Sequence, residues 1–186
     1  LVENFKPGTL EKWGYGWKDV SKKYPKLIYA SASGFGQTGP LKELPAYDMV
    51  VQGMGGLMSV TGQPNSGPTR VGTSIGDITA GLFTAIGINA ALYDRQKTNK
   101  GMYIDVSMLD CQIAILENAI ARYLAKNEIP KPMGSRHPSI APFEAFKTKD
   151  SHIIIAAGND KLFEKLCNLL DMPEMKQDSK FSDNSL

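Results

Sequence analysis

Apolar runs and helically spaced apolar residues follow one another along this chain and predict strands and helices in turn. Residues 27–31 form an apolar, strand-favouring run after Pro25 and are predicted to be a buried strand. Residues 102–106 are predicted to form a second strand. Between them lies the clearest predicted helix, residues 78–95, with Asp77 in the N-cap position. Its apolar residues fall roughly on one face: Ile78, Leu82, Phe83, Ile86, Ala90 and Leu92.

Two further segments of the first part of the chain are predicted to be helical. Residues 48–58 are apolar with glycines inside, and residues 107–127 carry apolar side chains at helical spacing. A short amphipathic stretch, residues 17–24, ends before Pro25. The mixed order of strands and helices predicts an α/β fold class.

The composition changes at residues 129–134, where prolines and a glycine predict a domain boundary. We expect residues 1–128 to be part of a larger domain, residues 129–142 a linker, and residues 143–186 the beginning of a smaller α+β domain. The elements expected in this last part are a strand, residues 152–156, and a helix, residues 160–170.

Composition and charge narrow the classes of protein to consider. With 42% hydrophobic and 22% charged residues, the 186-residue chain has a globular composition. Its formal net charge of +2 gives no electrostatic case for binding nucleic acid. No run approaches the roughly 18–20 consecutive apolar residues of a membrane span, so no membrane is expected. The chain begins at Leu1 rather than Met and ends in a polar stretch, so we expect a fragment.

Familiar catalytic and metal-binding motifs are missing from the sequence. Cys111 and Cys167 lie far apart, which disfavours a disulfide framework and fits a reducing, cytoplasmic compartment. With two histidines and no paired cysteine motif, no metal site is expected. The glycine-rich loop at residues 33–40 fits a weak dinucleotide fingerprint and a structural turn equally well.

Asp77 has two interpretations. As an N-cap residue, it would accept a hydrogen bond from the backbone of Thr79 or Ala80. As a catalytic group, its carboxylate would act as a covalent nucleophile at the positive end of a helix, where nearby N–H groups hold an oxyanion. Gly76 and Gly81 would then leave room for a substrate.

Two other pairs of residues also leave alternatives open. Tyr47 and Asp48 either cap the helix that follows them or line a pocket. Arg136 and His137 either bind an anion or belong to a solvated linker.

Several short motifs follow one another along most of the chain. They are Val2-Glu-Asn-Phe-Lys-Pro-Gly8, Leu27-Ile-Tyr-Ala-Ser31, Gly34-Phe-Gly-Gln-Thr-Gly-Pro40, Ala46-Tyr-Asp48, Gly67-Pro-Thr-Arg-Val-Gly72, Ile75-Gly-Asp77 and Asp105-Val-Ser-Met-Leu-Asp110. In this order they resemble the family III CoA-transferases, which include formyl-CoA transferase, carnitine CoA-transferase and succinyl-CoA–glutarate CoA-transferase. The resemblance implies part of a Rossmann-like large domain followed by the start of a smaller α+β domain.

The resemblance also implies a catalytic residue and a set of CoA contacts. The nucleophile of the family matches Asp77, which would carry a covalent aspartyl intermediate as CoA moves from an acyl-CoA donor to a carboxylic acid acceptor. The family's CoA contacts match Asn4, Phe5, Tyr47 and Met108, and Lys12 stands where an arginine often contacts the nucleotide. CoA thioesters are then substrates, and no tightly bound cofactor and no metal is implied.

Substrate, partner and alternative activity are also suggested by the resemblance. The region around Arg136 and His137 is similar to the succinyl-CoA–glutarate type, so we expect a short dicarboxylate acceptor with one of these residues near its distal carboxylate. Family members form interlocked dimers, which implies a homodimer. The alternatives are racemase-like proton transfer and an inactive CoA-binding fragment. An α-methylacyl-CoA racemase has a histidine where this chain has Tyr47, and a tyrosine is a poor base at neutral pH.

Overall fold

The computed structural model describes residues 1–181 and divides into two compact units. The first unit joins residues 1–62 to residues 66–131, and the second joins residues 63–65 to the chain from Pro132 onward.

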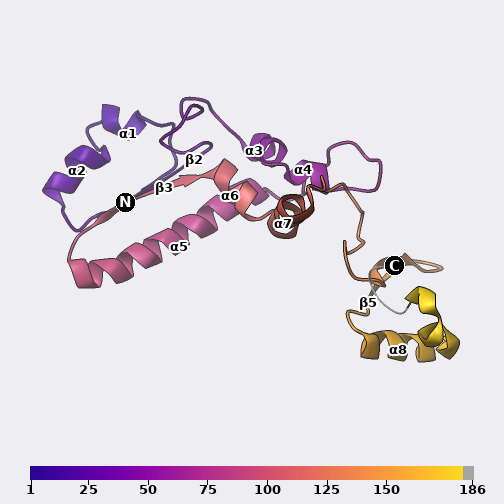
Figure 1. Cartoon of the computed structure of the whole chain (residues 1–186). Helices are drawn as coiled ribbons and strands as arrows, with labels where there is room; N and C mark the ends of the chain where they lie inside the picture. The colour runs from indigo at the N-terminus through magenta and orange to yellow at the C-terminus, as the bar shows by residue number, and fades with distance from the viewer. Residues whose placement is uncertain (182–186) are drawn as a thin grey trace. The chain divides into compact units, whose positions relative to one another are not determined.

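A three-stranded parallel sheet forms the centre of the first unit (Figure 1). Its strands are β1 (Val2–Glu3), β2 (Ile28–Ser33) and β3 (Met102–Ser107), with β2 in the middle. Ser33 is paired with Ser107, so β2 and β3 end level with one another. The two predicted strands are confirmed, and each extends one or two residues further than its apolar run. β1 was not predicted, because two residues show no period.

Helices cover both faces of this sheet, so the predicted α/β class is confirmed. Side chains alternate along β3: Ile104 contacts Gly87 of α5 (Ile75–Thr98), whereas Tyr103 stacks on Trp17 of α2 (Trp17–Lys23) at a centroid distance of 5.8 Å. In Figure 1, α5 accordingly runs along one side of the sheet and α2 lies on the other. A further short helix, α1, spans Thr9–Lys12.

Two predicted helices are each broken into two. The segment 48–58 forms α3 (Asp48–Met54) and α4 (Leu57–Val60), because Gly56 between them takes a left-handed φ of 84°. The segment 107–127 forms α6 (Met108–Ala114) and α7 (Glu117–Lys126), with Glu117 at a φ of 36°. The expectation of continuous helices was wrong because apolar spacing continues through a break in the backbone.

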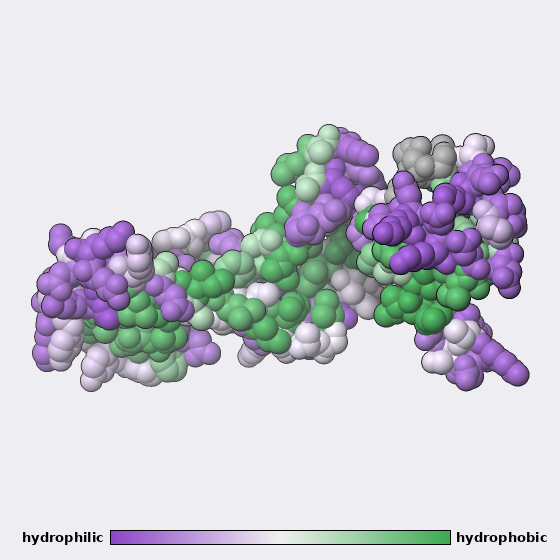
Figure 2. Space-filling view, turned by 90° about the horizontal axis from the view of Figure 1, so that it is seen from below, coloured by the Kyte–Doolittle hydropathy of each residue, from purple (hydrophilic) through white to green (hydrophobic). Residues whose placement is uncertain are grey.

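The long helix α5 packs on the sheet through small residues rather than through its apolar side chains. Ala80, Thr84 and Ala91 are buried, whereas Leu82 is 58% and Ile86 62% exposed. Figure 2, viewed from below, shows apolar residues gathered on the surface over this part of the molecule. By length and composition, α5 is also apolar enough to cross a membrane, a test that core helices of soluble proteins pass as well.

The core of the first unit lies where the ends of α3, α5, β3 and α6 meet. Its buried apolar residues are Val51, Ala80, Val106, Met108 and Cys111. This core therefore fixes the start of α5 next to the carboxyl ends of the strands.

The second unit is a hairpin followed by a helix. β4 (Phe143–Lys147) pairs antiparallel with β5 (His152–Ala156), and α8 (Asp160–Leu169) precedes two 3₁₀ turns, η1 (Pro173–Gln177) and η2 (Ser179–Phe181). The predicted strand 152–156 is confirmed, and the predicted helix 160–170 is confirmed with its end one residue earlier.

Candidate functional site

A cleft of about 680 Å³ lies at the carboxyl ends of β1 and β2, where open parallel sheets bind their ligands. We call it the Asp77 cleft. Its walls come from the chain after β1, the end of β2, the segment before α3, the start of α5 and the first residue of α6. Its lining includes Asn4, Phe5, Lys6, Ser33, Gly34, Tyr47, Asp48, Arg70, Ser74, Asp77 and Met108.

The Asp77 cleft brings together most of the residues predicted to form the site. Asp77 lines it together with Asn4, Phe5, Tyr47 and Met108. Met108 is buried, whereas Tyr47 is 80% exposed and Phe5 packs edge-on against Trp13.

Lys12 is the exception among the predicted CoA contacts. It is exposed at the end of α1 and is not part of the lining of the cleft. A contact between this lysine and the nucleotide of CoA stays a prediction.

Asp77 is not the N-cap of its helix, which corrects the capping interpretation. The helix begins at Ile75 with Ser74 as N-cap, so Asp77 is the third helical residue. Its side chain is exposed and has no hydrogen-bond or ion-pair partner in the part of the chain that the structure describes. The carboxylate therefore points into a cleft at the positive end of a helix, with both oxygens available.

The start of α5 is capped from a distance, by Asp48. This side chain is buried at 8% exposure, and its Oδ1 accepts a hydrogen bond from the Gly76 N–H at 2.8 Å. Its Oδ2 accepts a bond from Gln52 Nε2 at 2.9 Å and lies 3.5 Å from Arg70 Nε. Asp48 was expected to cap the helix that follows it or to line a pocket; it lines the cleft and caps a different helix.

Gln52 extends this network to the segment before α5. Its side chain is fully buried, and its Oε1 accepts a hydrogen bond from the Val71 N–H at 2.9 Å. Asp48 and Gln52 stand four residues apart on α3, and together they fasten Arg70 and Gly76 to that helix. Two polar residues at i and i+4 in an otherwise apolar helix were the signal that sequence reasoning missed.

The two glycines beside Asp77 have different roles. A Cβ on Gly81 would meet nothing within 4 Å, and Gly81 lines a second cleft of about 680 Å³ that also includes Asp77. A Cβ on Gly76 would lie 2.8 Å from Val51 Cγ2 and 3.0 Å from Asp48 Oδ1. Gly81 thus leaves open space as expected, whereas Gly76 allows the close approach of Asp48 rather than of a substrate.

The backbone at the start of α5 offers fewer donors for an oxyanion than expected. The N–H of Gly76 is bound to Asp48, and the N–H of Ile78 donates to the Ser74 carbonyl at 3.0 Å. The N–H of Asp77 has no acceptor among residues 1–181. A bound oxyanion would therefore be met by this one amide of the first turn.

The glycine-rich loop after β2 is a structural turn in this chain. The Gln37 N–H donates to both carboxylate oxygens of Asp105 at 3.0 Å, and Gly36 adopts a φ of 80°. Desolvation raises the pKa of Asp105, as does the charge of Asp110, whereas the Gln37 hydrogen bond lowers it. The next helix begins only at Asp48, so the strand–turn–helix arrangement of a dinucleotide site is not met.

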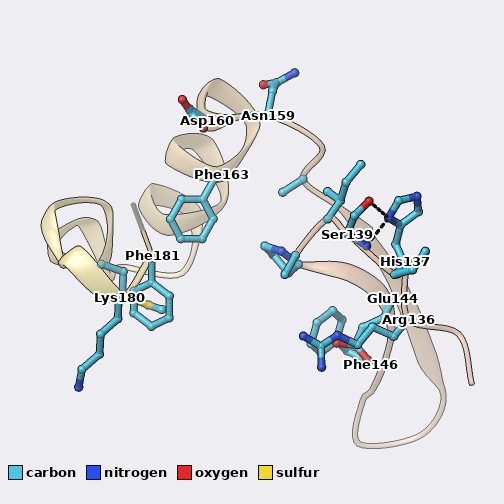
Figure 3. Close-up of a pocket in the computed structure, with 16 residues that line it drawn as sticks. Arg136, His137, Ser139, Glu144, Phe146, Asn159, Asp160, Phe163, Lys180 and Phe181 are labelled. Carbon is cyan, nitrogen blue, oxygen red and sulfur yellow. Dashed lines mark hydrogen bonds between the residues drawn. The ribbon is translucent and has the colours of Figure 1, made fainter. Parts of the chain in front are cut away.

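Arg136 and His137 lie in the second unit and line a pocket of about 350 Å³ there (Figure 3). His137 Nδ1 accepts a hydrogen bond from the Ser139 N–H at 3.2 Å, and its ring lies 5.2 Å from that of Phe143. The pocket also contains Glu144, so it carries both charge signs.

The described residues contain no group of three or more His, Cys, Asp or Glu that would hold a metal ion. Cys111 and Cys167 are both free and buried. Burial is the main cause that raises the pKa of the Cys111 thiol, which disfavours the thiolate that a nucleophile needs.

Comparisons with known proteins agree on one family. Residues 1–186 match the model of CoA-transferase family III. The acetyl-CoA:oxalate CoA-transferase of Acetobacter aceti is 47% identical over 99% of this chain and 48% of its own length. The human succinyl-CoA:glutarate CoA-transferase is 41% identical over 100% of this chain and 42% of its own length.

Solved structures show the same fold. A crystal structure of a CAIB/BAIF family protein from Brucella suis matches with a TM-score of 0.83 and 43% identity, over 99% of this chain and 49% of that one. A protein from Mycobacterium tuberculosis matches with a TM-score of 0.84 and 29% identity, over 99% of this chain and 49% of that one. The chain thus spans about half the length of the relatives it matches. The chain belongs to CoA-transferase family III.

Proposed function

We propose that this chain is the nucleophile-bearing part of an acyl-CoA:carboxylate CoA-transferase, and that Asp77 carries its covalent aspartyl intermediate. One observation carries the proposal. The Asp77 carboxylate is exposed and unpaired in a cleft that also contains Asn4, Phe5, Tyr47 and Met108, the residues expected to contact CoA.

The first half of the proposed reaction loads CoA onto the protein. An oxygen of the Asp77 carboxylate attacks the thioester carbonyl of the donor, the C–S bond breaks, and CoA leaves as a thiolate. The product is a mixed anhydride. The thiolate then attacks the carbonyl carbon of Asp77, the donor acid leaves as a carboxylate, and an aspartyl-CoA thioester remains.

The second half repeats these steps with the acceptor. The acceptor carboxylate attacks the aspartyl thioester and releases CoA thiolate, which forms a second mixed anhydride. The thiolate attacks the acceptor's carbonyl carbon, so that the new acyl-CoA leaves and the Asp77 carboxylate is restored. No water or proton is consumed, and the site needs a nucleophile, an oxyanion donor and protection from hydrolysis.

Asp77 and the four expected CoA contacts in the cleft each have a role in this reaction. The Asp77 N–H would donate to the oxyanion of the tetrahedral intermediates, since the neighbouring amides are occupied. Asn4, Phe5, Tyr47 and Met108 would hold CoA, with the aromatic rings and the thioether against its apolar parts. Lys12 would contact the nucleotide.

Racemase-like proton transfer is disfavoured because it needs a second base beside Asp77 in the cleft. The described residues that line the cleft include neither His137 nor His152, and Tyr47 is a poor base at neutral pH. Exchange of the α-hydrogen of a branched acyl-CoA with D₂O, without transfer of CoA, would favour the racemase.

The proposed acceptor is a short dicarboxylate. The two curated relatives described above are named for oxalate and glutarate, which are both diacids. A CoA-exchange panel tests this: preference for formate or carnitine over short diacids would contradict it. A role for Arg136 or His137 at the distal carboxylate remains a prediction that the same panel can address with variants.

We further propose that the whole protein is a cytoplasmic homodimer, without a membrane or nucleic-acid partner. Within it, residues 1–128 would belong to the large domain, residues 129–142 to a linker, and residues 143–186 to the start of the small domain.

Trapping of the intermediate is the decisive experiment. The whole protein that contains this chain is mixed with a donor acyl-CoA and hydroxylamine, which converts an aspartyl thioester or anhydride into a stable hydroxamate. Mass spectrometry should locate the adduct at Asp77. The matched control is Asp94→Ala, which removes a half-buried carboxylate near the other end of the same helix. Labelling elsewhere, or no labelling during CoA transfer, would contradict the assignment. No transfer at all would favour the inactive CoA-binding fragment.

A further inference from the structure

Arg70 is a cation of the Asp77 cleft that no step above uses. It precedes α5, lines the cleft with Asp77, and keeps 42% of its side chain exposed. Among the described residues, its Nε faces one partner, Asp48 Oδ2 at 3.5 Å. Its terminal nitrogens have no hydrogen-bond or ion-pair partner within residues 1–181.

Asp48 couples this guanidinium to the start of α5. One carboxylate oxygen faces Arg70 Nε, and the other accepts the Gly76 N–H, immediately before Asp77 in the chain. Gln52 holds the same carboxylate and also binds the backbone of Val71, next to Arg70. Arg70 is therefore anchored at both its backbone neighbour and its Nε, while the far edge of its planar fork stays free.

A carboxylate is the ligand that best fits this free edge. A guanidinium presents parallel N–H donors that match the two oxygens of a carboxylate. While its Nε faces the Asp48 carboxylate, its terminal nitrogens can bind a second carboxylate. The phosphates of CoA are a poorer match, because the long pantetheine arm separates them from the sulfur that must reach Asp77. The group that binds Arg70 therefore belongs to the carboxylic acid substrate and not to CoA.

We infer that Arg70, oriented by Asp48, binds the second carboxylate of a short dicarboxylate substrate while its first carboxylate reacts at Asp77. This inference rests on the proposed function and assigns a specificity-determining residue to the same cleft. Lys6 also lines the cleft, but it is an exposed point charge. Arg70 is the better carboxylate ligand, because its planar guanidinium is held in place at Nε by Asp48.

The test compares a diacid with its own monoester. In the whole protein that contains this chain, KM is measured for the short diacid that the wild type uses best and for the monomethyl ester of that acid. Arg70→Gln should raise KM for the diacid about 10- to 100-fold, the effect of losing a charged hydrogen bond. With acetyl-CoA as donor, KM for the monoester and for the donor should stay within about twofold, because neither molecule offers a second carboxylate to Arg70.

Matched variants keep the result interpretable. Arg70→Lys retains the charge and the cleft, and should give an intermediate KM for the diacid. If Arg70→Gln does not fold, Arg70→Lys replaces it in the comparison of diacid and monoester. Arg95→Gln removes an arginine from the other end of α5, where its Nη1 donates to the Lys26 carbonyl, and should leave both KM values unchanged. Arg136→Gln tests the other candidate arginine.

Three outcomes would overturn the inference: an equal effect of Arg70→Gln on diacid and monoester, a selective effect of Arg136→Gln instead, or no wild-type preference for the diacid. Failure of the proposed function looks different. In that case the wild type moves CoA to neither acceptor and yields no adduct at Asp77. A wild type that transfers CoA through Asp77, with a non-selective Arg70→Gln, contradicts the Arg70 inference alone.

Discussion

The helices α5 and α8 both begin beside a cavity, and they are capped in opposite ways. In α8 the cap is local: Asn159 Oδ1 accepts a hydrogen bond from the Leu162 N–H at 3.0 Å, three residues along. In α5 the N-cap residue Ser74 makes no side-chain cap, and Asp48 reaches the Gly76 N–H from 28 residues earlier.

The difference separates two tasks that one residue usually combines. A local cap uses the side chain at the helix start to satisfy the helix itself. At α5 the buried carboxylate of Asp48, from another helix, binds the free backbone N–H of Gly76. The carboxylate of Asp77 is therefore not needed to cap the helix. Asp77 is then exposed at the positive end of the helix without being needed to hold it.

Replacing Asp77 gives the largest effect that this comparison predicts, and only on activity. Asp77→Asn in the whole protein should lower CoA transfer at least about a thousandfold, because the nucleophile is lost. The free energy of unfolding of the first unit should fall by less than about 1 kcal/mol, the size of a first-turn charge–dipole interaction. Urea unfolding followed by tryptophan fluorescence measures this, since Trp13 and Trp17 both lie in the first unit.

The matched control for this variant is Asp48→Asn, which should lower the free energy of unfolding of the first unit more than Asp77→Asn does. If Asp77→Asn destabilised the first unit by several kcal/mol, Asp77 would be structural, and the separation of tasks would be wrong.

Removing the distant cap has the next largest effect. Asp48→Ala leaves the Gly76 N–H, the Gln52 amide and Arg70 without their shared acceptor, and should lower the free energy of unfolding of the first unit by about 2–4 kcal/mol. Asp48→Asn keeps an oxygen for the Gly76 N–H and should cost less. Tryptophan fluorescence in urea gives both values, and equal stability of wild type and Asp48→Ala would contradict the distant cap.

The contrast between local and long-range interactions also explains which elements could be predicted from the sequence. The strands Ile28–Ser33 and Met102–Ser107 and the helix α8 follow from apolar runs and from spacing, which are local properties. The breaks at Gly56 and Glu117 were missed, because a period in hydrophobicity persists across a kink.

The candidate site was predictable only in part, for a related physical reason. Asp77 stands close to a helix start in sequence, and five of the six residues expected around the CoA and nucleophile positions line one cleft. The pairing of Asp48 with Gly76 and Arg70 is long-range, so no local pattern encodes it. The apolar face of α5 likewise gave no sign that small residues pack on the sheet instead.

Gly76 tests how closely the distant cap must approach. Gly76→Ala places a methyl group 2.8 Å from Val51 Cγ2 and 3.0 Å from Asp48 Oδ1, which should cost about 1–3 kcal/mol by overpacking. Gly81→Ala is the matched control in the same helix, where the methyl meets nothing within 4 Å and should stabilise by up to about 1 kcal/mol. Urea unfolding of both variants should show opposite signs; a stabilising Gly76→Ala would contradict the close contact.

The local cap of α8 gives the smallest effect and the sharpest contrast. Asn159→Ala removes the acceptor of the Leu162 N–H and should cost about 1 kcal/mol, and Asn159→Asp should retain most of the stability because a carboxylate also caps. Hydrogen exchange of the α8 amides, read by mass spectrometry, measures the loss in the second unit. Tryptophan fluorescence of the first unit should not change, because the bond joins residues three apart within one unit. A loss that spread to the first unit would show that the α8 cap, like that of α5, serves more than its own helix.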